Sequence, residues 1–183
     1  YHANCADGFT AFWVTQKALS LRGESWHGVP GKYGTPLDLH QFRQNDTLYI
    51  VDFSLSPEET AELTSSGVIV VWLDHHVSAY KAYQEAHLLE APFTEDWSRN
   101  EINNLPERIN SYAYSEDKSG ATICWDYFAS VFELHGINRP LLLDHIEDRD
   151  LWKFQLAGTK ELTQEIFSHA YDLGTWDKLM SAN

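Results

Sequence analysis

Short apolar runs alternate along this chain with mixed polar and apolar segments, in the order expected for alternating strands and helices. The runs 48–51 and 68–73 are rich in β-branched and apolar residues, which predicts two buried strands. Between them, Ser56 begins a capping-box pattern that predicts a helix from residue 57 to about Gly67. A strand, a helix and a strand in this order predict parallel strands joined by a right-handed crossover.

Amphipathic or apolar segments elsewhere predict further helices. We expect them at residues 9–19, 77–89, 119–134, 141–152 and about 163–173. The Gly- and Pro-rich segment 23–36 and the polar segment 92–110 are expected to be loops. The whole pattern predicts an α/β fold with a parallel β-sheet flanked by helices on both faces. The length predicts a single domain over residues 1–183.

The composition narrows the class of partner. Asp and Glu number 27 against 13 Lys and Arg, which gives a formal net charge of −14. Tight binding to long nucleic acid needs a basic stripe, and the sequence has none, so we expect no long nucleic-acid partner. We see no bilayer-length apolar run and no secretory leader, which predicts no membrane partner. The two cysteines, Cys5 and Cys124, do not indicate a disulfide framework, and we expect a cytoplasmic protein.

Acidic and imidazole side chains follow both predicted strands. The triplet Asp-His-His at 74–76 comes directly after the run 68–73, and Asp52 comes directly after the run 48–51. Open α/β sheets bind their ligands at the carboxyl ends of the strands. Taken alone, the triplet is a weak motif that also fits a solvated loop with one capping Asp.

Two further segments carry the same kinds of side chain. The N-terminal loop holds His2, Cys5 and Asp7, where Asp7 either caps the following helix or holds a metal, and Gly8 allows close approach to a phosphate. A later helix ends in the acidic cluster 147–150. If these ends converge, their carboxylates repel one another unless a cation neutralises them. Two metal ions are a common solution, and they suit phosphoryl chemistry.

In this order, the segments resemble the motifs of the DHH phosphoesterases. The matching segments are 2–8, 51–52, 74–76 and 147–152, and residues 118–121 resemble the small-residue segment of the family. Each motif is unspecific by itself, but the ordered set is specific and covers nearly the whole chain. The resemblance implies a DHH phosphoesterase-like sheet and metal-dependent phosphoester hydrolysis.

The resemblance also implies a ligand set for two divalent metal ions, with Mn²⁺ as the first choice and Mg²⁺ or Co²⁺ as alternatives. Asp52 would bridge the two metals. The other implied ligands are His2 for one metal and Asp7, His75 and Asp150 for the second, with Asp148 as the alternative to Asp150.

Further roles surround these ligands. The resemblance implies that Asp74 orients His75 through the ring N–H, as metal-bound imidazoles usually require. It implies that His76 faces the scissile phosphate. Arg149 either pairs with a substrate phosphate in a bidentate fork or forms a salt bridge with its acidic neighbours Glu147 and Asp148.

A predicted helix start offers a further phosphate contact. Lys118, Ser119 and Gly120 lie there, where backbone N–H groups favour anions. Capping of the helix alone would explain Ser119 equally well.

The chain departs from the family pattern in two respects. Many members have an Asp where this chain has Cys5, which either ligates a metal as a thiolate and favours a softer metal, or is a small buried side chain. Members also have a strand before the first motif and usually a Gly- and His-rich C-terminal domain. We therefore expect either a minimal catalytic domain or a fragment.

We expect a metal-dependent phosphohydrolase that cleaves small phosphoesters through a hydroxide activated by two metals. The expected substrates are short oligonucleotides, dinucleotides or nucleoside bisphosphates. The alternatives are a pyrophosphatase or polyphosphatase, a non-catalytic nucleotide-binding module, and a structural metal site.

The remaining aromatic residues and histidines receive simpler interpretations. Aromatic residues on loops are candidates for stacking on a nucleobase, namely Trp26, Trp97 and Tyr33. Tryptophans within predicted elements are expected in the core, namely Trp13, Trp72, Trp125 and Trp152. The lone histidines are expected to be structural or surface groups, namely His27, His40, His87, His135, His145 and His169. His145 is a special case because it precedes Asp148 and Arg149 by one helical turn.

Overall fold

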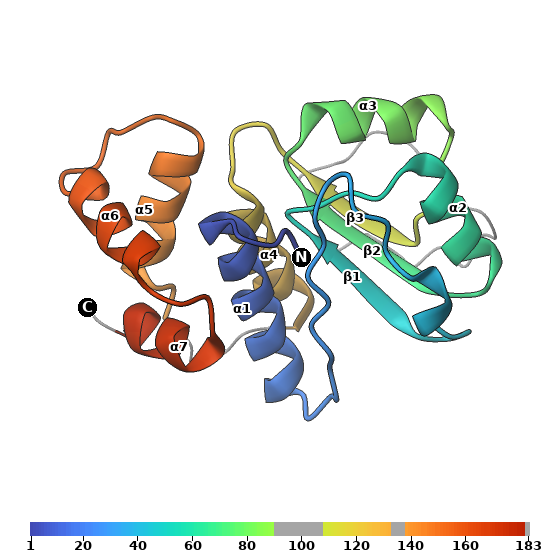
Figure 1. The fold of residues 1–183 in the computed structure, drawn as a ribbon, viewed down its shortest axis with the longest axis horizontal. Coiled ribbons are helices and arrows are strands. Elements are labelled where there is room, and N and C mark those ends of the chain that lie inside the picture. Colours follow the sequence, from blue (N-terminus) through green and yellow to red (C-terminus); the bar gives the residue numbers. More distant parts are fainter. Residues whose placement is uncertain (90–107, 133–137, 182–183) are drawn as a thin grey trace.

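A computed structural model describes residues 1–89, 108–132 and 138–181, and its centre is a parallel sheet of three strands. The strands are β1 (Thr47–Val51), β2 (Ile69–Asp74) and β3 (Ser111–Tyr114), in the order β1-β2-β3 (Figure 1). Val51 of β1 pairs with Leu73 of β2, and all three strands run in the same direction. The side chains that follow Val51 and Leu73 therefore leave the sheet at the same edge.

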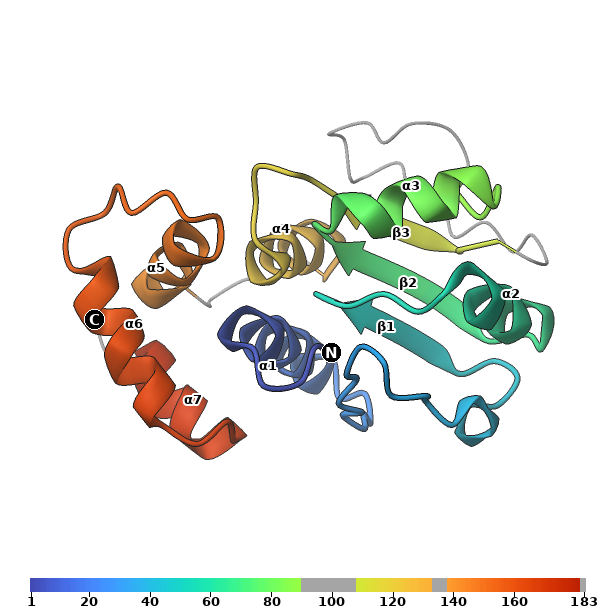
Figure 2. The ribbon, with the colours of Figure 1, turned by 45° about the horizontal axis from the view of Figure 1, so that its top comes forward.

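Seven helices and one short 3-10 helix lie in the described part of the chain. Their bounds are α1 (Ala6–Leu21), η1 (Leu39–Gln41), α2 (Pro57–Ser65), α3 (Val77–Glu85), α4 (Gly120–Phe132), α5 (Leu141–Asp150), α6 (Thr159–Ser168) and α7 (Leu173–Ser181). Helices α1 and α4 cover one face of the sheet and α2 and α3 the other (Figure 2). Helices α5, α6 and α7 pack outside α1 and α4, which places the helical layer containing α1 and α4 in the middle of the molecule.

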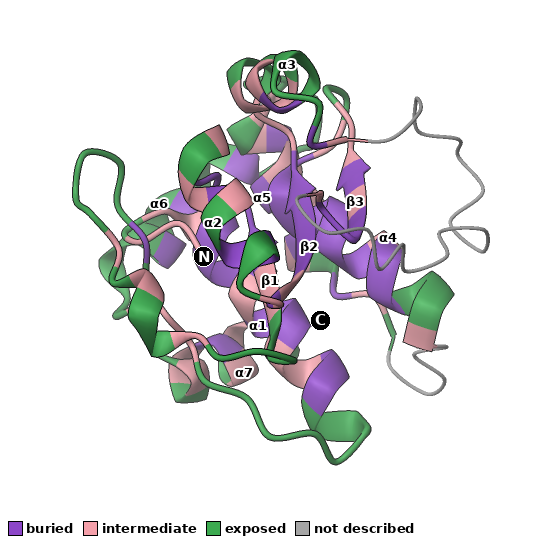
Figure 3. Cartoon of the chain, turned by 90° about the vertical axis from the view of Figure 1, so that its right-hand side faces the viewer, coloured by how far each residue is buried: buried purple, intermediate pink, exposed green. Residues whose placement is uncertain are grey.

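The alternation of side chains along the strands divides the core in two. Val71 and Leu73 pack with α1 and α4, whereas Val70 and Trp72 pack with α2 and α3. Figure 3 shows β2 buried along almost its whole length. This central strand is therefore rigidly held, and the residues at its carboxyl end are fixed by packing on both faces.

The α/β class, the parallel pairing and the helices on both faces are confirmed. The helix after β1 begins as predicted: the Ser56 hydroxyl accepts a hydrogen bond from the Glu59 backbone N–H, and the Glu59 carboxylate accepts one from the Ser56 N–H. Both predicted strands are present within one residue of their expected bounds.

Several element boundaries were predicted wrongly. Strand β3 was missed, α1 begins three residues earlier than residue 9, and α3 ends at Glu85 rather than 89. The predicted helix 163–173 is wrong, because two helices, α6 and α7, occupy this part of the chain. Asp172 separates them, since its carboxylate accepts hydrogen bonds from the backbone N–H and hydroxyl of Thr175 and so caps α7.

Some predictions concern residues that the structure does not describe, and the prediction for Trp152 is corrected by it. Most of the predicted loop 92–110, with Trp97, and residues 133–134 of the predicted helix lie outside the described residues. Trp152 is not a core residue, because 73% of its surface is exposed. Within the described ranges, no helix is long and apolar enough to span a membrane.

Candidate metal centre

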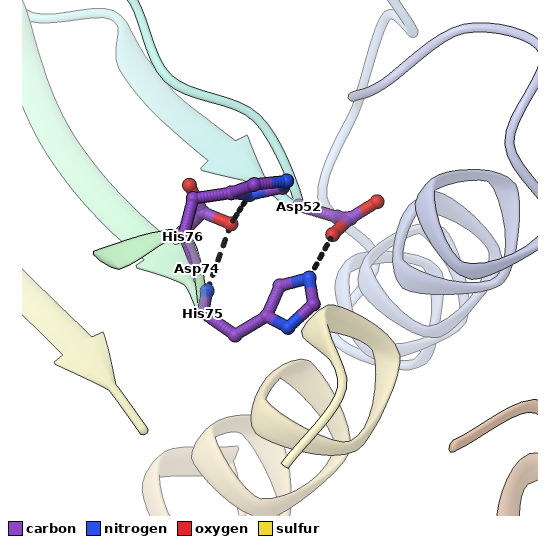
Figure 4. Close-up of side chains that lie close together, drawn as sticks. All are labelled: Asp52, Asp74, His75 and His76. Atoms are coloured by element: carbon purple, nitrogen blue, oxygen red, sulfur yellow. Dashed lines mark hydrogen bonds and ion pairs between the residues drawn. The ribbon is translucent and has the colours of Figure 1, made fainter. Parts of the chain in front are cut away.

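The carboxyl edge of β1 and β2 brings four polar side chains together. Asp52 follows β1, while Asp74 ends β2 and is followed by His75 and His76 (Figure 4). Asp52 adopts the left-handed region, with φ +47°, while its N–H still bonds the Leu73 carbonyl at 2.9 Å. A non-glycine residue in this region is strained, and such strain persists only where the surroundings impose it.

Asp52 is buried and incompletely paired. Its Oδ1 lies 3.2 Å from Nε2 of His75, and its Oδ2 lies 3.8 Å from Nδ1 of His2. Within the described part of the chain, Oδ1 has no hydrogen-bond partner, because the contact with His75 lacks hydrogen-bond alignment. Burial, with the nearby carboxylates of Asp74 and Asp150, raises the pKa of Asp52 to about 8. A carboxylate in this setting is stabilised only by protonation or by a cation.

The two oxygens of Asp52 lie between two groups of possible metal ligands. One group is His2, Cys5 and Asp52, and the other is Asp7, His75 and Asp150. Within each group, the donor atoms lie within 4.8 Å of one another. The first group joins the chain before α1 to the residue after β1, whereas the second joins α1, the residue after β2 and the end of α5.

A third, overlapping group contains the four residues of Figure 4, Asp52, Asp74, His75 and His76. The arrangement brings together the predicted ligands His2, Asp7, Asp52, His75 and Asp150, with Cys5 beside them. Their roles as ligands stay a prediction.

Asp7 lies inside the first turn of α1 and does not cap that helix. Its carboxylate instead accepts hydrogen bonds from the N–H groups of Gly120 and Ala121, at 2.7 and 3.1 Å, where α4 begins. Burial, followed by the charges of Asp52 and Asp150, raises the pKa of Asp7 well above its ordinary value. Asp7 therefore links the candidate centre to the middle helical layer.

This link changes the interpretation of the predicted phosphate contacts. Gly120 uses its N–H to hold Asp7, and Ser119 is fully buried and caps α4 by accepting a hydrogen bond from the Thr122 N–H. Lys118 donates to Asp126 at 2.9 Å. The placement of these residues supports the capping interpretation rather than a phosphate contact.

Two glycines allow Asp52 to fit. A Cβ atom at Gly120 would lie 2.5 Å from Cβ of Asp52, and one at Gly8 would lie 2.5 Å from the carbonyl oxygen of His2. Real Cβ atoms do not approach backbone or buried side chains so closely, so both positions exclude a side chain. Gly8 thus permits close approach of His2 and Asp52, whereas the sequence suggested close approach of a phosphate.

Asp74 orients a different histidine from the one expected. Its Oδ1 bonds Nδ1 of His76 at 2.7 Å and accepts the backbone N–H of His75, while its Oδ2 accepts the Ser54 hydroxyl at 2.6 Å. The hydrogen bond that His76 donates to Asp74 raises the pKa of His76 to about 9. Burial alone would raise the pKa of Asp74, but the hydrogen bond and charge of His76, with the hydrogen bonds from Ser54 and the His75 N–H, outweigh it and lower the pKa.

These shifts leave a protonated His76 at neutral pH, with a third of its side chain exposed. Ser54, which fixes Asp74, was missed at the sequence level. Its position two residues after Asp52 was the available signal.

The structure separates the two candidate acids of the last cluster. Asp150 Oδ2 lies 3.6 Å from Nε2 of His75, within the centre. Asp148 instead accepts hydrogen bonds from the Gln155 N–H, the Leu156 N–H and the Thr159 hydroxyl, which holds the turn after α5. The placement therefore favours Asp150 as the candidate ligand, as the sequence reading preferred.

The neighbouring candidates of α5 lie outside the ligand groups. His145 bonds the hydroxyl of Thr159 at 2.8 Å, which fits a structural role. Arg149 makes no ion pair among the described residues, and its guanidinium lies over the ring of Phe167, 4.5 Å from the centroid. The expected alternative, a salt bridge between Arg149 and its acidic neighbours, is thus not formed.

The loop aromatics differ in their distance from the centre. The ring of Tyr33 lies 5.3 Å from that of His2 and 6.1 Å from that of His76, at the margin of the centre. Trp26 packs against Phe12 and lines a separate groove beside β1. Only Tyr33 of these two is therefore placed to contact a ligand at the centre.

The donor set fits a divalent cation. Among the described residues, no lysine or arginine forms an ion pair with Asp7, Asp52 or Asp150. Carboxylates and imidazoles are the usual ligands of manganese, zinc and related ions, and a thiolate adds preference for softer ones. The unpartnered Oδ1 of Asp52, between two ligand groups, is the observation that supports the fit.

Comparison with known proteins finds similarity to a viral protein. An uncharacterized protein of Acanthamoeba polyphaga mimivirus, R106, is 22% identical over 200 aligned residues, which cover 98% of this chain and 39% of the viral protein. The chain thus spans about two fifths of the length of this relative. No family model and no solved structure matches the chain.

Proposed function

We propose that this domain is a metal-dependent phosphohydrolase, similar to the DHH phosphoesterases, that cleaves small phosphoesters. The observation that carries the proposal is the position of Asp52, whose two carboxylate oxygens face His2 on one side and His75 on the other. One carboxylate between two ligand groups is the arrangement that two-metal hydrolases use to hold their ions close together.

In the proposed reaction, the residues of the centre would form two metal sites. His2 and Cys5 would hold one cation with Asp52, while Asp7, His75 and Asp150 would hold the other. Bound cations would supply an activated water and neutralise phosphate oxygens.

His76 has a separate role in the proposal. Since Asp74 keeps it protonated and oriented, it donates a hydrogen bond to an oxygen of the phosphoester, where negative charge develops. Its partly exposed ring lets a substrate reach it.

The electrostatic character of the molecule favours small substrates. A net charge of −14 repels a long polyanion, whereas a small phosphoester contacts mainly the metal-neutralised centre. We therefore propose dinucleotides, short oligonucleotides or nucleoside bisphosphates as substrates, with Mn²⁺ as the first metal to test.

The decisive experiment is hydrolysis of a panel that contains a dinucleotide, a nucleoside bisphosphate, a cyclic dinucleotide and pyrophosphate. Each would be incubated with Mn²⁺, with Mg²⁺ and with chelator. We expect metal-dependent turnover that is lost in Asp52→Asn, because an amide cannot bridge two cations as a carboxylate does. The near-isosteric amide preserves the packing around this buried side chain.

Two substitutions on the same helix, one inside the centre and one outside it, provide a matched control. Asp150→Asn should weaken metal binding and turnover, whereas Asp144→Asn, also on α5 but paired with Arg139, should change neither. Unchanged turnover in Asp52→Asn would refute the two-metal proposal. Metal binding without turnover of any panel member would favour a binding module instead.

A further inference from the structure

A cavity of about 290 Å³ lies between the start of α1, the end of α5 and the side of α6. Cys5, Asp7 and Asp150 form part of its wall, so the cavity is continuous with the candidate metal centre. When one part of a ligand is held at the centre, the cavity therefore has room for the rest of that ligand.

Aromatic and cationic side chains line the rest of this cavity. Trp152 and Phe167 are exposed, and Arg149 lies between them, 5.9 Å from the Trp152 ring and 4.5 Å from the Phe167 ring. A guanidinium stacked on one ring keeps its N–H groups directed outward in the plane, where they can donate to a further ligand.

The backbone holds Trp152 in its exposed position. Trp152 has φ +58° and Phe154 has φ +47°, which is strained for bulky side chains. The carbonyl of Asp148 accepts the N–H groups of Lys153 and Phe154, and its carboxylate holds the turn beyond them. The buried carboxylate of Asp148 thus fixes a strained turn that holds an exposed indole in the wall of the cavity.

We propose that this cavity binds the nucleobase of a nucleotide phosphoester, with the base on Trp152 and the phosphate at the metal centre. The inference rests on the proposed function, and it selects nucleotides over pyrophosphate or polyphosphate, which have no aromatic surface. The size of the cavity suits one base rather than a long chain. Stacking on the indole and hydrogen bonds from Arg149 supply the recognition.

The test compares substrates with and without a base. Trp152→Ala should lower kcat/KM for a dinucleotide by about 10-fold to 100-fold, the loss expected for one base stack, and leave pyrophosphate hydrolysis unchanged. Trp152→Phe should restore part of the loss. Trp26→Ala removes another exposed indole, outside the cavity, and should have no effect.

Binding measurements separate this inference from the proposed function. Calorimetric titration of the metal-loaded protein with adenosine 3′,5′-bisphosphate should show binding that weakens in Trp152→Ala. If no substrate is hydrolysed but this loss of binding is seen, the base site stands and the hydrolase proposal fails. Equal effects of Trp152→Ala on the dinucleotide and on pyrophosphate, or binding that does not depend on Trp152, would overturn the base site.

Discussion

Asp52 combines a left-handed backbone, burial and an oxygen without a hydrogen-bond partner among the described residues. Strain of this kind costs about 1–3 kcal/mol, and an unpaired buried polar atom costs a similar amount. Burying such a residue reduces stability unless another component binds there. A cation between Asp52 and the imidazoles of His2 and His75 would remove the electrostatic part of this cost.

In the proposed centre, Cys5 would decide what kind of cation the group of His2, Cys5 and Asp52 prefers. It lies with His2 and Asp52, and its side chain makes no capping hydrogen bond to α1. Burial, with the charge of Asp52, raises the pKa of the thiol to about 12, so the metal-free protein holds it protonated. Coordination by a metal deprotonates a thiol despite such a shift.

If Cys5 is a ligand, Co²⁺ binding should produce a sulfur-to-cobalt charge-transfer absorption in the near ultraviolet. We expect this band to be lost in Cys5→Ser. It should remain in Cys124→Ala, because Cys124 is buried in the core between α1 and α4. A spectrum without the band in the unmodified protein would show that Cys5 is a packing residue.

At the scale of elements, the start of α4 is shaped by the centre. Gly120 contacts Asp52 so closely that even a methyl group at this position would displace it. We therefore expect Gly120→Ala to lower the free energy of unfolding by about 1–3 kcal/mol, despite the better helix propensity of alanine. The same change should weaken metal binding, because Asp7 is held by the N–H groups of this turn.

Chemical denaturation and calorimetric metal titration would measure the two effects of Gly120→Ala. Gly174→Ala, in α7, is the matched control, since a Cβ there meets only the Asp172 carboxylate at 3.4 Å. It should not reduce stability. Wild-type stability and metal affinity in Gly120→Ala would contradict the close packing against Asp52.

The sequence predicted the elements that local patterns define. Runs of β-branched residues gave β1 and β2, and the capping box of Ser56 gave the start of α2. Strand β3 was missed because it has only four residues, and these mix polar and apolar side chains. The boundary between α6 and α7 was missed because it depends on a cap by Asp172 rather than on Gly or Pro.

In the candidate site too, the sequence predicted some features and missed others. The order of the motifs predicted which residues would be ligand candidates, and the structure places these residues close together at the carboxyl edge of the sheet. The pairing of Asp74 with His76, the role of Asp148 in a turn and the exposure of Trp152 depend on tertiary contacts. No local pattern distinguishes Asp148 from Asp150.

At the scale of the whole molecule, the acidic centre couples stability to pH. A group whose folded pKa is raised stabilises the fold below its unfolded pKa, and this contribution is lost as the pH rises through the folded pKa. Asp52, raised from 3.8 to about 8, and His76, raised from 6.5 to about 9, both act in this direction. The pKa values of His2 and Asp74 are lowered, so these groups act in the opposite direction. The stability that they contribute is present above their unfolded pKa values and is lost as the pH falls through their folded pKa values.

The metal-free protein should therefore lose stability between pH 5 and pH 9. A loss of about 2 kcal/mol corresponds to a decrease in Tm of about 4–8 °C for a chain of this size. Saturating Mn²⁺ should raise Tm most at the alkaline end, because bound cations replace protons. Thermal unfolding across this range, with Asp52→Asn as the variant that flattens the metal-free profile, tests the coupling. A Tm of the metal-free protein that rises towards pH 9 would contradict it.

The carboxylate of Asp7 has one further consequence. It belongs to a ligand group at the sheet edge and, through Gly120 and Ala121, to the first turn of the helix at the middle of the molecule. A substitution that shifts α4 within the core would therefore alter cation affinity without changing a ligand. In the proposed metal centre, core packing and metal affinity would depend on the same two hydrogen bonds, so a change in one property would change the other.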